Sequence, residues 1–218
     1  MAKIGIYGAS FDPITNAHLW TASSIAHKCK LDCVIFLPCS NQRLDKQINI
    51  SDEHRWNMIC LAIDGNDKFV ADDYEMKNYH RDSATYYTME YFREKYPEDD
   101  IYFIIGADLL VEIGNEKWKK SKELVQKNKF IVMARNGINM LETIAKSPIL
   151  RNVDDGQTFN LIDKGLTMDI SSTYIRNEFQ KDGEPRYLLP ESCYEYIRNN
   201  HLYEQKGGIS NEQTNEDY

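Results

Sequence analysis

The sequence of 218 residues contains no long apolar run. No segment approaches the about 20 consecutive apolar residues that a membrane-spanning helix needs. The opening MAKIGIYGAS also lacks the pattern of a secretory signal, because glycines interrupt its apolar stretch and Asp12 and Pro13 follow it. These absences exclude an integral membrane protein, give no reason to expect a membrane partner, and favour a cytoplasmic location.

Cysteine is scarce as well. The five cysteines are an odd number, and most of them lie within apolar strand or helix patterns, so a disulfide framework is not expected. Cys29, Cys33 and Cys39 are closely spaced, but no second ligand pair completes a metal site. We expect reduced, buried thiols and no metal ion held by the protein alone.

Positive charge is in deficit. The chain has 26 basic and 34 acidic residues, for a net charge of −8. Proteins that coat nucleic acid need stripes of lysine and arginine, so nucleic acid is not an expected partner. A small anionic ligand needs only a local positive site, and the composition leaves that possibility open.

The sequence does contain a regular alternation of short apolar runs and longer amphipathic segments. The apolar runs that predict strands are 3–8, 32–39, 68–75, 101–108, 129–135 and, more weakly, 159–163. The patterns that predict helices between them are 17–29, 52–63, 84–96, 119–128 and 139–147. Nearly continuous apolar strands separated by helices predict an α/β fold with a doubly wound parallel sheet, whose ligands bind beyond the carboxyl ends of the strands.

The character of the chain changes after residue 170. Two helical patterns, 172–180 and 191–199, follow each other without an intervening strand, which predicts a small helical C-terminal part at about 171–203. Residues 204–218 are polar and include Gly-Gly, so we expect a disordered tail. Residues 1–203 are therefore expected to form a single domain.

The stretch GASFDPITNAH, residues 8–18, directly follows the first apolar run. A strand that ends in a glycine-containing turn and leads into a helix is a recurrent phosphate-binding arrangement, although the same turn also occurs without a ligand. Its expected phosphate-binding backbone amides are those of Gly8, Ala9, Ser10 and Phe11. Thr15 then begins the helix and places His18 in its first turn, where His18 is either a group facing the phosphates or a core histidine.

A second polar cluster lies in ISSTYIR, residues 170–176. Ser171, Ser172 and Thr173 stand at a predicted helix start, where their hydroxyls cap free amides. Arg176 lies one turn further along the same face. Hydroxyls, amides and a guanidinium together suit a phosphate, although an ordinary capped helix with a surface arginine has the same pattern.

Together these motifs resemble the two signatures of the nucleotidylyltransferase superfamily. GASFDPITNAH is similar to GxFDPxTxGH, with Thr15 at the first histidine position, Ala17 in place of the usual glycine and His18 at the second histidine. ISSTYIR resembles the superfamily's C-terminal ISSTxIR, which binds ATP phosphates. The resemblance implies a Rossmann-like nucleotidylyltransferase fold.

The intervening sequence resembles one branch of that superfamily, the nicotinate and nicotinamide mononucleotide adenylyltransferases. IYFIIGADLL looks like the family's FIIGADxL, which implies that Gly106 and Asp108 lie against the adenosine ribose and the phosphates. Trp118 resembles the tryptophan that lines the pyridine pocket, and stacking on an electron-poor ring suits it physically. The resemblance extends to YLLPESCYEYIRNNHLY and covers residues 3–203.

The mononucleotide side matches less closely. SATYYTM can be aligned with the family's SYTxxTL, which implies that Thr85, and near it Tyr87, contacts the pyridine-bearing substrate. Arg55 belongs to a weaker RxxM match that packing alone could explain. Residues 39–50 depart from the family's usual PHK-type loop, and Arg43 and Lys46 are the residues able to supply the missing positive charge.

The resemblance implies transfer of AMP from ATP to nicotinate or nicotinamide mononucleotide, with release of pyrophosphate and with Mg²⁺ accompanying ATP. His18 would donate to the α-phosphate, Thr15 would orient it, and Arg176 would hold the departing pyrophosphate. Phosphopantetheine adenylyltransferase and a non-catalytic nucleotide sensor on the same fold remain alternatives. A homo-oligomer is an open expectation, and so is the choice between the two pyridine bases.

Overall fold

In the computed structural model, residues 1–43, 47–78, 85–163 and 170–204 can be described. They contain a six-stranded sheet, parallel throughout, in the order β3-β2-β1-β4-β5-β6. The strands are β1 (Lys3–Ala9), β2 (Cys33–Pro38), β3 (Phe69–Ala71), β4 (Asp100–Gly106), β5 (Lys129–Met133) and β6 (Phe159–Ile162). The order reverses between β1 and β4, so the two halves of the sheet diverge there, and this confirms the predicted doubly wound fold.

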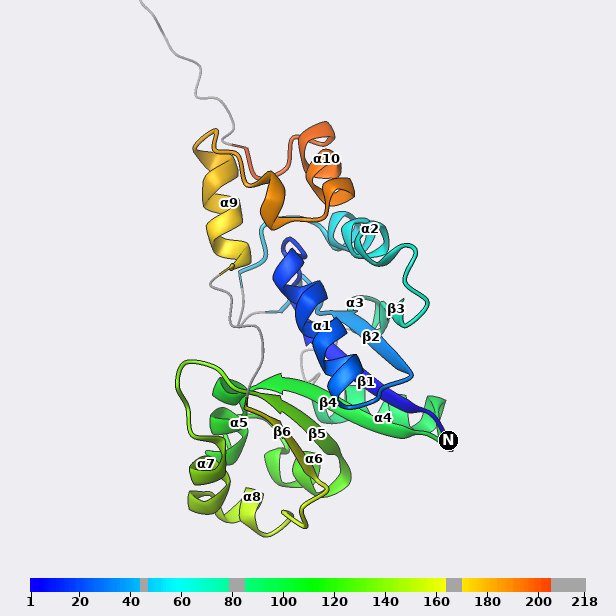
Figure 1. Ribbon diagram of the computed structural model, residues 1–218, viewed down its shortest axis with the longest axis vertical. Coiled ribbons are helices and arrows are strands. Elements are labelled where there is room, and N and C mark those ends of the chain that lie inside the picture. Colours follow the sequence, from blue (N-terminus) through cyan, green and yellow to red (C-terminus); the bar gives the residue numbers. More distant parts are fainter. Residues whose placement is uncertain (44–46, 79–84, 164–169, 205–218) are drawn as a thin grey trace, which may run out of the picture.

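Helices cover both faces of this sheet (Figure 1). One face carries α3 (Tyr74–Lys77), α4 (Thr85–Lys95), α5 (Ala107–Gly114), α6 (Ser121–Lys127), α7 (Met140–Lys146) and α8 (Pro148–Arg151). The other face carries α1 (Asn16–Lys28), α2 (Asp52–Ile63), α9 (Ser172–Gln180), the short 3₁₀ helix η1 (Arg186–Leu188) and α10 (Glu191–Asn199).

Alternating strand residues build the two cores. In β4, Phe103 and Ile105 belong to the core on the side of helices α4 to α8, whereas Ile104 between them belongs to the core on the side of α1. Apolar residues on both sides of each strand are what a parallel sheet buried between two helical layers requires. This explains why its strands read as unbroken apolar runs.

The helical C-terminal part is present as predicted. Figure 1 shows α9 and α10 at one end of the molecule and α7 and α8 at the other. The α10 helix lies on α2, where the Tyr196 hydroxyl accepts from Asn57 Nδ2 at 2.9 Å and lies 3.0 Å from His54 Nδ1. Of the predicted polar tail, residues 205–218 lie outside the described residues. No helix in the described part of the chain is long and apolar enough to cross a membrane.

Two predicted strands are too long because each runs into a helix that the sequence did not predict. The strand expected over 68–75 stops at Ala71, because the Asp72 carboxylate accepts from Tyr74 N at 2.9 Å and turns the backbone into α3. The strand expected over 101–108 stops at Gly106, which is the N-cap of the unpredicted α5.

Candidate active site

The carboxyl ends of β1 and β4 lie side by side where the strand order reverses, and Tyr7 pairs with Ile104 just before both strands end. The first signature leaves β1 at this edge, and Gly106 and Asp108 leave β4 there. Phe103 is close to the first signature, since a Cβ placed on Gly8 would lie 3.6 Å from Phe103 Cε2. The fold therefore brings together two of the segments that the sequence assigned to ATP.

Thr15 fixes the orientation of the His18 imidazole. Thr15 is the N-cap of α1, and His18 is the third residue of the helix, so the two form a capping box. Thr15 N donates to His18 Nδ1 at 3.0 Å, and Thr15 Oγ1 lies 2.9 Å from the same nitrogen. A backbone amide can only donate, so Nδ1 is the acceptor and the neutral ring carries its proton on Nε2.

Burial keeps this imidazole neutral. Desolvation, reinforced by the positive charge of Arg135, lowers the His18 pKa to about 4. The ring packs edge-on against Phe11 at a centroid distance of 5.1 Å and lies 6.2 Å from the Tyr7 ring. His18 is thus a fixed neutral group whose free nitrogen, Nε2, is a hydrogen-bond donor at neutral pH.

The second signature begins α9 and is joined to the first. Ser171 is the N-cap and accepts from Tyr174 N at 3.1 Å, as the sequence predicts. Ser172 Oγ donates to the carbonyl of Pro13 at 2.8 Å. Arg176 Nη1 donates to the carbonyl of Asp12 at 2.6 Å, and its Nη2 donates to Thr173 Oγ1 at 3.1 Å. Two segments about 160 residues apart therefore form one polar corner.

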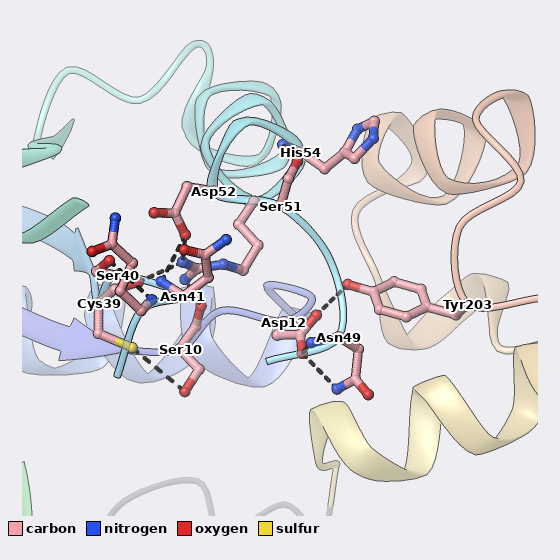
Figure 2. A network of polar contacts seen from close by, with 12 residues as sticks. Ser10, Asp12, Cys39, Ser40, Asn41, Asn49, Ser51, Asp52, His54 and Tyr203 are labelled. Atoms are coloured by element: carbon pink, nitrogen blue, oxygen red, sulfur yellow. Dashed lines mark hydrogen bonds and ion pairs between the residues drawn. The ribbon is translucent and has the colours of Figure 1, made fainter. Parts of the chain in front are cut away.

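Asp12 is the centre of a network that sequence reasoning missed. Its side chain is 2% exposed, and Tyr203 Oη donates to its Oδ1 at 2.7 Å. Asn49 donates to its Oδ2 from both its backbone N (2.9 Å) and its Nδ2 (2.8 Å). Figure 2 shows these three residues meeting from the first signature, the 47–50 segment and the C-terminal end of the described chain.

Arg55 is fully buried and ties the ends of two strands to α2. Its guanidinium donates to the carbonyls of Ser10 and Cys39, each at 2.5 Å, and forms an ion pair with Asp52. The weak RxxM match therefore marks a structural arginine behind the proposed phosphate loop. The same network in Figure 2 includes Ser10, Cys39 and Asp52.

At the end of β4, Asp108 faces an arginine that the sequence did not single out. A Cβ at Gly106 would lie 2.4 Å from Asp108 Oδ1, so glycine is what allows this carboxylate to fold back over its own strand end. Asp108 Oδ2 lies 3.6 Å from Arg135 Nη1. Arg135 lies just after β5, the neighbour of β4 in the sheet. Its place beyond the carboxyl end of a parallel strand is the signal by which the sequence could have indicated a site residue.

Two of the mononucleotide-side residues, Trp118 and Tyr87, lie against Phe103 and at the start of α4, respectively. Trp118 lies edge-on to Phe103 at 6.4 Å and donates from Nε1 to Glu112 at 2.9 Å. Lys120, two residues later, places its Nζ 4.3 Å from the ring centroid of Tyr87. The segment after α5 and the start of α4 are thereby in contact.

Three further predictions are less defined by the structure. Thr85 is half-buried at the first residue of α4. Arg43 lies in a turn in which its backbone N donates to Ser40 O at 3.4 Å, and Lys46 lies outside the described residues. In the described ranges, no group of three or more histidine, cysteine, aspartate or glutamate side chains is placed to hold a metal ion.

Comparison with known proteins assigns this architecture to a family. Residues 6–178 match the cytidylyltransferase-like family model. A Clostridium tetani protein named "Probable nicotinate-nucleotide adenylyltransferase" is 38% identical over 205 residues, covering 93% of this chain and 100% of the relative. The chain belongs to the nicotinate-nucleotide adenylyltransferase family.

Further members support this placement. A Clostridium botulinum protein of the same name is 34% identical over 205 residues, with coverage of 93% and 100%. A solved structure, the Plasmodium falciparum nicotinic acid mononucleotide adenylyltransferase complexed with NaAD, superimposes with a TM-score of 0.74 at 27% identity, covering 93% of this chain and 98% of that one. The nicotinate-nucleotide adenylyltransferase family thus shares this fold over nearly the whole described chain.

Proposed function

We propose that this protein transfers the adenylyl group of ATP to nicotinate mononucleotide, forming the dinucleotide and pyrophosphate in NAD biosynthesis. The 5′-phosphate oxygen of the mononucleotide attacks the α-phosphorus of ATP in line. The bond from the α-phosphorus to the bridging oxygen breaks, and pyrophosphate leaves with that oxygen. No covalent enzyme intermediate is needed, because the mononucleotide phosphate is itself the nucleophile.

In this proposal His18 acts on the α-phosphate. Its Nε2–H donates to the oxygen on which negative charge builds up as the new bond forms, and Thr15 holds the ring in that tautomer. A donor that is already neutral and fixed needs no proton transfer or reorientation during the step. Arg176 stabilises the charge on the departing pyrophosphate.

The remaining phosphate contacts come from both signatures. The amides of Gly8, Ala9, Ser10 and Phe11 and the α9 start at Ser171, Ser172 and Thr173 surround the triphosphate. Mg²⁺ enters as the ion of MgATP, coordinated chiefly by phosphate oxygens, which is its usual arrangement at nucleotide sites. The ribose of ATP lies against Gly106 and Asp108.

For the second substrate, Trp118 stacks on the pyridinium ring, and Thr85 and Tyr87 contact its carboxylate. Arg43 and Lys46 are assigned to the mononucleotide phosphate on charge alone. We choose nicotinate over nicotinamide because the curated relatives are named for nicotinate. A cytoplasmic location is part of the proposal and is supported by the five free cysteines.

One observation carries the proposal. Ser172 and Arg176 of α9 bond to the backbone of Pro13 and Asp12, only a few residues from His18. A phosphate-binding helix start therefore borders the loop that presents a neutral imidazole donor.

The test is pyrophosphate release from MgATP with nicotinate mononucleotide, nicotinamide mononucleotide and phosphopantetheine as separate acceptors. We expect release with nicotinate mononucleotide at the highest kcat/KM, and a fall of about 10²–10³ in kcat for His18→Ala in a protein that still folds. Preference for phosphopantetheine would replace the proposal with the rival transferase. ATP binding without release with any acceptor would indicate a sensor.

A further inference from the structure

The buried Asp12 carboxylate lies between a tyrosine and the arginine assigned to the triphosphate. Its Oδ1 accepts from Tyr203 Oη, and its Oδ2 accepts twice from Asn49 (Figure 2). Arg176 Nη1 is 3.8 Å from Oδ2, too far for a hydrogen bond, although it reaches the Asp12 carbonyl at 2.6 Å. The carboxylate therefore takes its hydrogen bonds from neutral donors, and it meets the guanidinium only as an ion pair at 3.8 Å.

Tyr203 is held in place for this contact. Its ring stacks on Phe179, one turn after Arg176 in α9, at a centroid distance of 6.3 Å. Its backbone has φ of +66°, a conformation that is unusual for a bulky residue and that persists only where surrounding contacts enforce it. Burial and the neighbouring Asp12 charge raise the Tyr203 pKa well above 10, so the hydroxyl keeps its proton and donates it to Asp12.

We propose that Tyr203 is a positioning residue for ATP: by saturating Asp12, its hydroxyl prevents the carboxylate from capturing Arg176 and keeps the guanidinium at the triphosphate site. A buried carboxylate that loses a donor has to find another, and among the described residues Arg176 is the cation already paired with it. A direct hydrogen bond would shorten the present ion pair of 3.8 Å and draw the guanidinium toward Asp12, away from the phosphates. The inference rests on the proposed function only in naming the reaction that follows ATP binding. Binding of the triphosphate itself can be measured without turnover.

The test compares Tyr203→Phe with the matched control Tyr196→Phe. Each variant keeps its ring and loses one hydroxyl that ties the C-terminal part to the rest of the chain. Within the described part of the chain, however, the Tyr196 hydroxyl bonds only to His54 and Asn57 of α2. Melting temperature, the KM values for both substrates, and the dissociation constant of a nonhydrolysable ATP analogue are measured for each.

For Tyr203→Phe we expect the KM for ATP and the dissociation constant of the analogue to rise about tenfold, the scale of one hydrogen bond to a charged group. The KM for the mononucleotide should stay within about twofold. Asn49→Ala, which removes another donor to Asp12, should also raise the KM for ATP and the dissociation constant of the analogue. Tyr196→Phe should lower the melting temperature without changing ATP affinity.

Equal changes in ATP affinity in Tyr203→Phe and Tyr196→Phe would overturn the inference, because a general loosening of the C-terminal part would then explain both. A lower melting temperature in Tyr203→Phe with unaltered ATP affinity would overturn it too. If the wild-type protein binds the analogue but transfers nothing to any acceptor, the proposed function fails, and the binding comparison still decides the role of Tyr203.

Discussion

At the scale of single residues, the proposed role of His18 as a hydrogen-bond donor depends on its protonation state. The Thr15 amide occupies Nδ1, and burial disfavours the charged ring, so the free protein holds a neutral imidazole. The sequence predicts the pairing of Thr15 with His18, because three-residue spacing at a helix start is a local pattern. It does not predict Arg135 beside them, since that contact depends on how β5 lies in the sheet.

This protonation state makes stability depend on pH. The His18 pKa is about 4 in the folded chain and has the ordinary value of 6.5 in the unfolded chain. Above pH 6.5 neither state binds the proton. Between pH 6.5 and pH 4 only the unfolded state binds the proton. The free energy of unfolding therefore decreases as the pH is lowered through this range, by roughly 3 kcal/mol in total.

Urea unfolding of the wild type and His18→Gln at pH 7 and pH 4.5 measures this contribution. The variant should lose less stability on acidification, since the acidic side chains are common to both proteins. Parallel losses in the two proteins would show that His18 is not the group responsible.

Trp118 offers a residue-scale prediction for the second substrate. Trp118→Ala should raise the KM for nicotinate mononucleotide about 5- to 150-fold, because aromatic stacking on a base is worth about 1–3 kcal/mol, while the KM for ATP changes little. Trp118→Phe keeps a ring against Phe103 and should lose much less. Steady-state kinetics with each substrate varied in turn decides this, and equal loss for both substrates would contradict the stacking role.

At the scale of elements, the sequence locates most helices and strands but extends two strands into the helices that follow them. IYFIIGADLL is apolar on both sides of Gly106, so nothing local separates β4 from α5. The short α3 is hidden because Asp72 and Asp73 look like the polar end of a strand, whereas the Asp72 carboxylate begins a helix. Both errors arise where a hydrogen bond or a cap, rather than periodicity, sets the boundary.

The contribution of α2 to the proposed phosphate loop can be measured by replacing Arg55. Arg55→Met should lower the free energy of unfolding by about 3–5 kcal/mol, because it leaves the Ser10 and Cys39 carbonyls and the Asp52 carboxylate without their buried cation. Urea denaturation measures the loss. A change below about 1 kcal/mol, as for an ordinary surface substitution, would contradict this role.

At the scale of the whole molecule, strand periodicity and the two signatures suffice to predict the doubly wound sheet, the helical C-terminal part and the convergence of the signatures. They do not suffice for the Asp12–Tyr203 bond, which joins residues 191 positions apart, because neither residue belongs to a local pattern that points to the other. Homo-oligomerisation remains a prediction, and so does the role of Lys46.

The central claim is that the two signatures hold ATP with its α-phosphate at His18. The most direct measurement is a crystal structure with a nonhydrolysable ATP analogue and Mg²⁺. We expect His18 Nε2 within about 3 Å of an α-phosphate oxygen, with Arg176 and the α9 start on the outer phosphates. A triphosphate bound away from α9, or an imidazole whose Nε2 faces only apolar side chains, would contradict it.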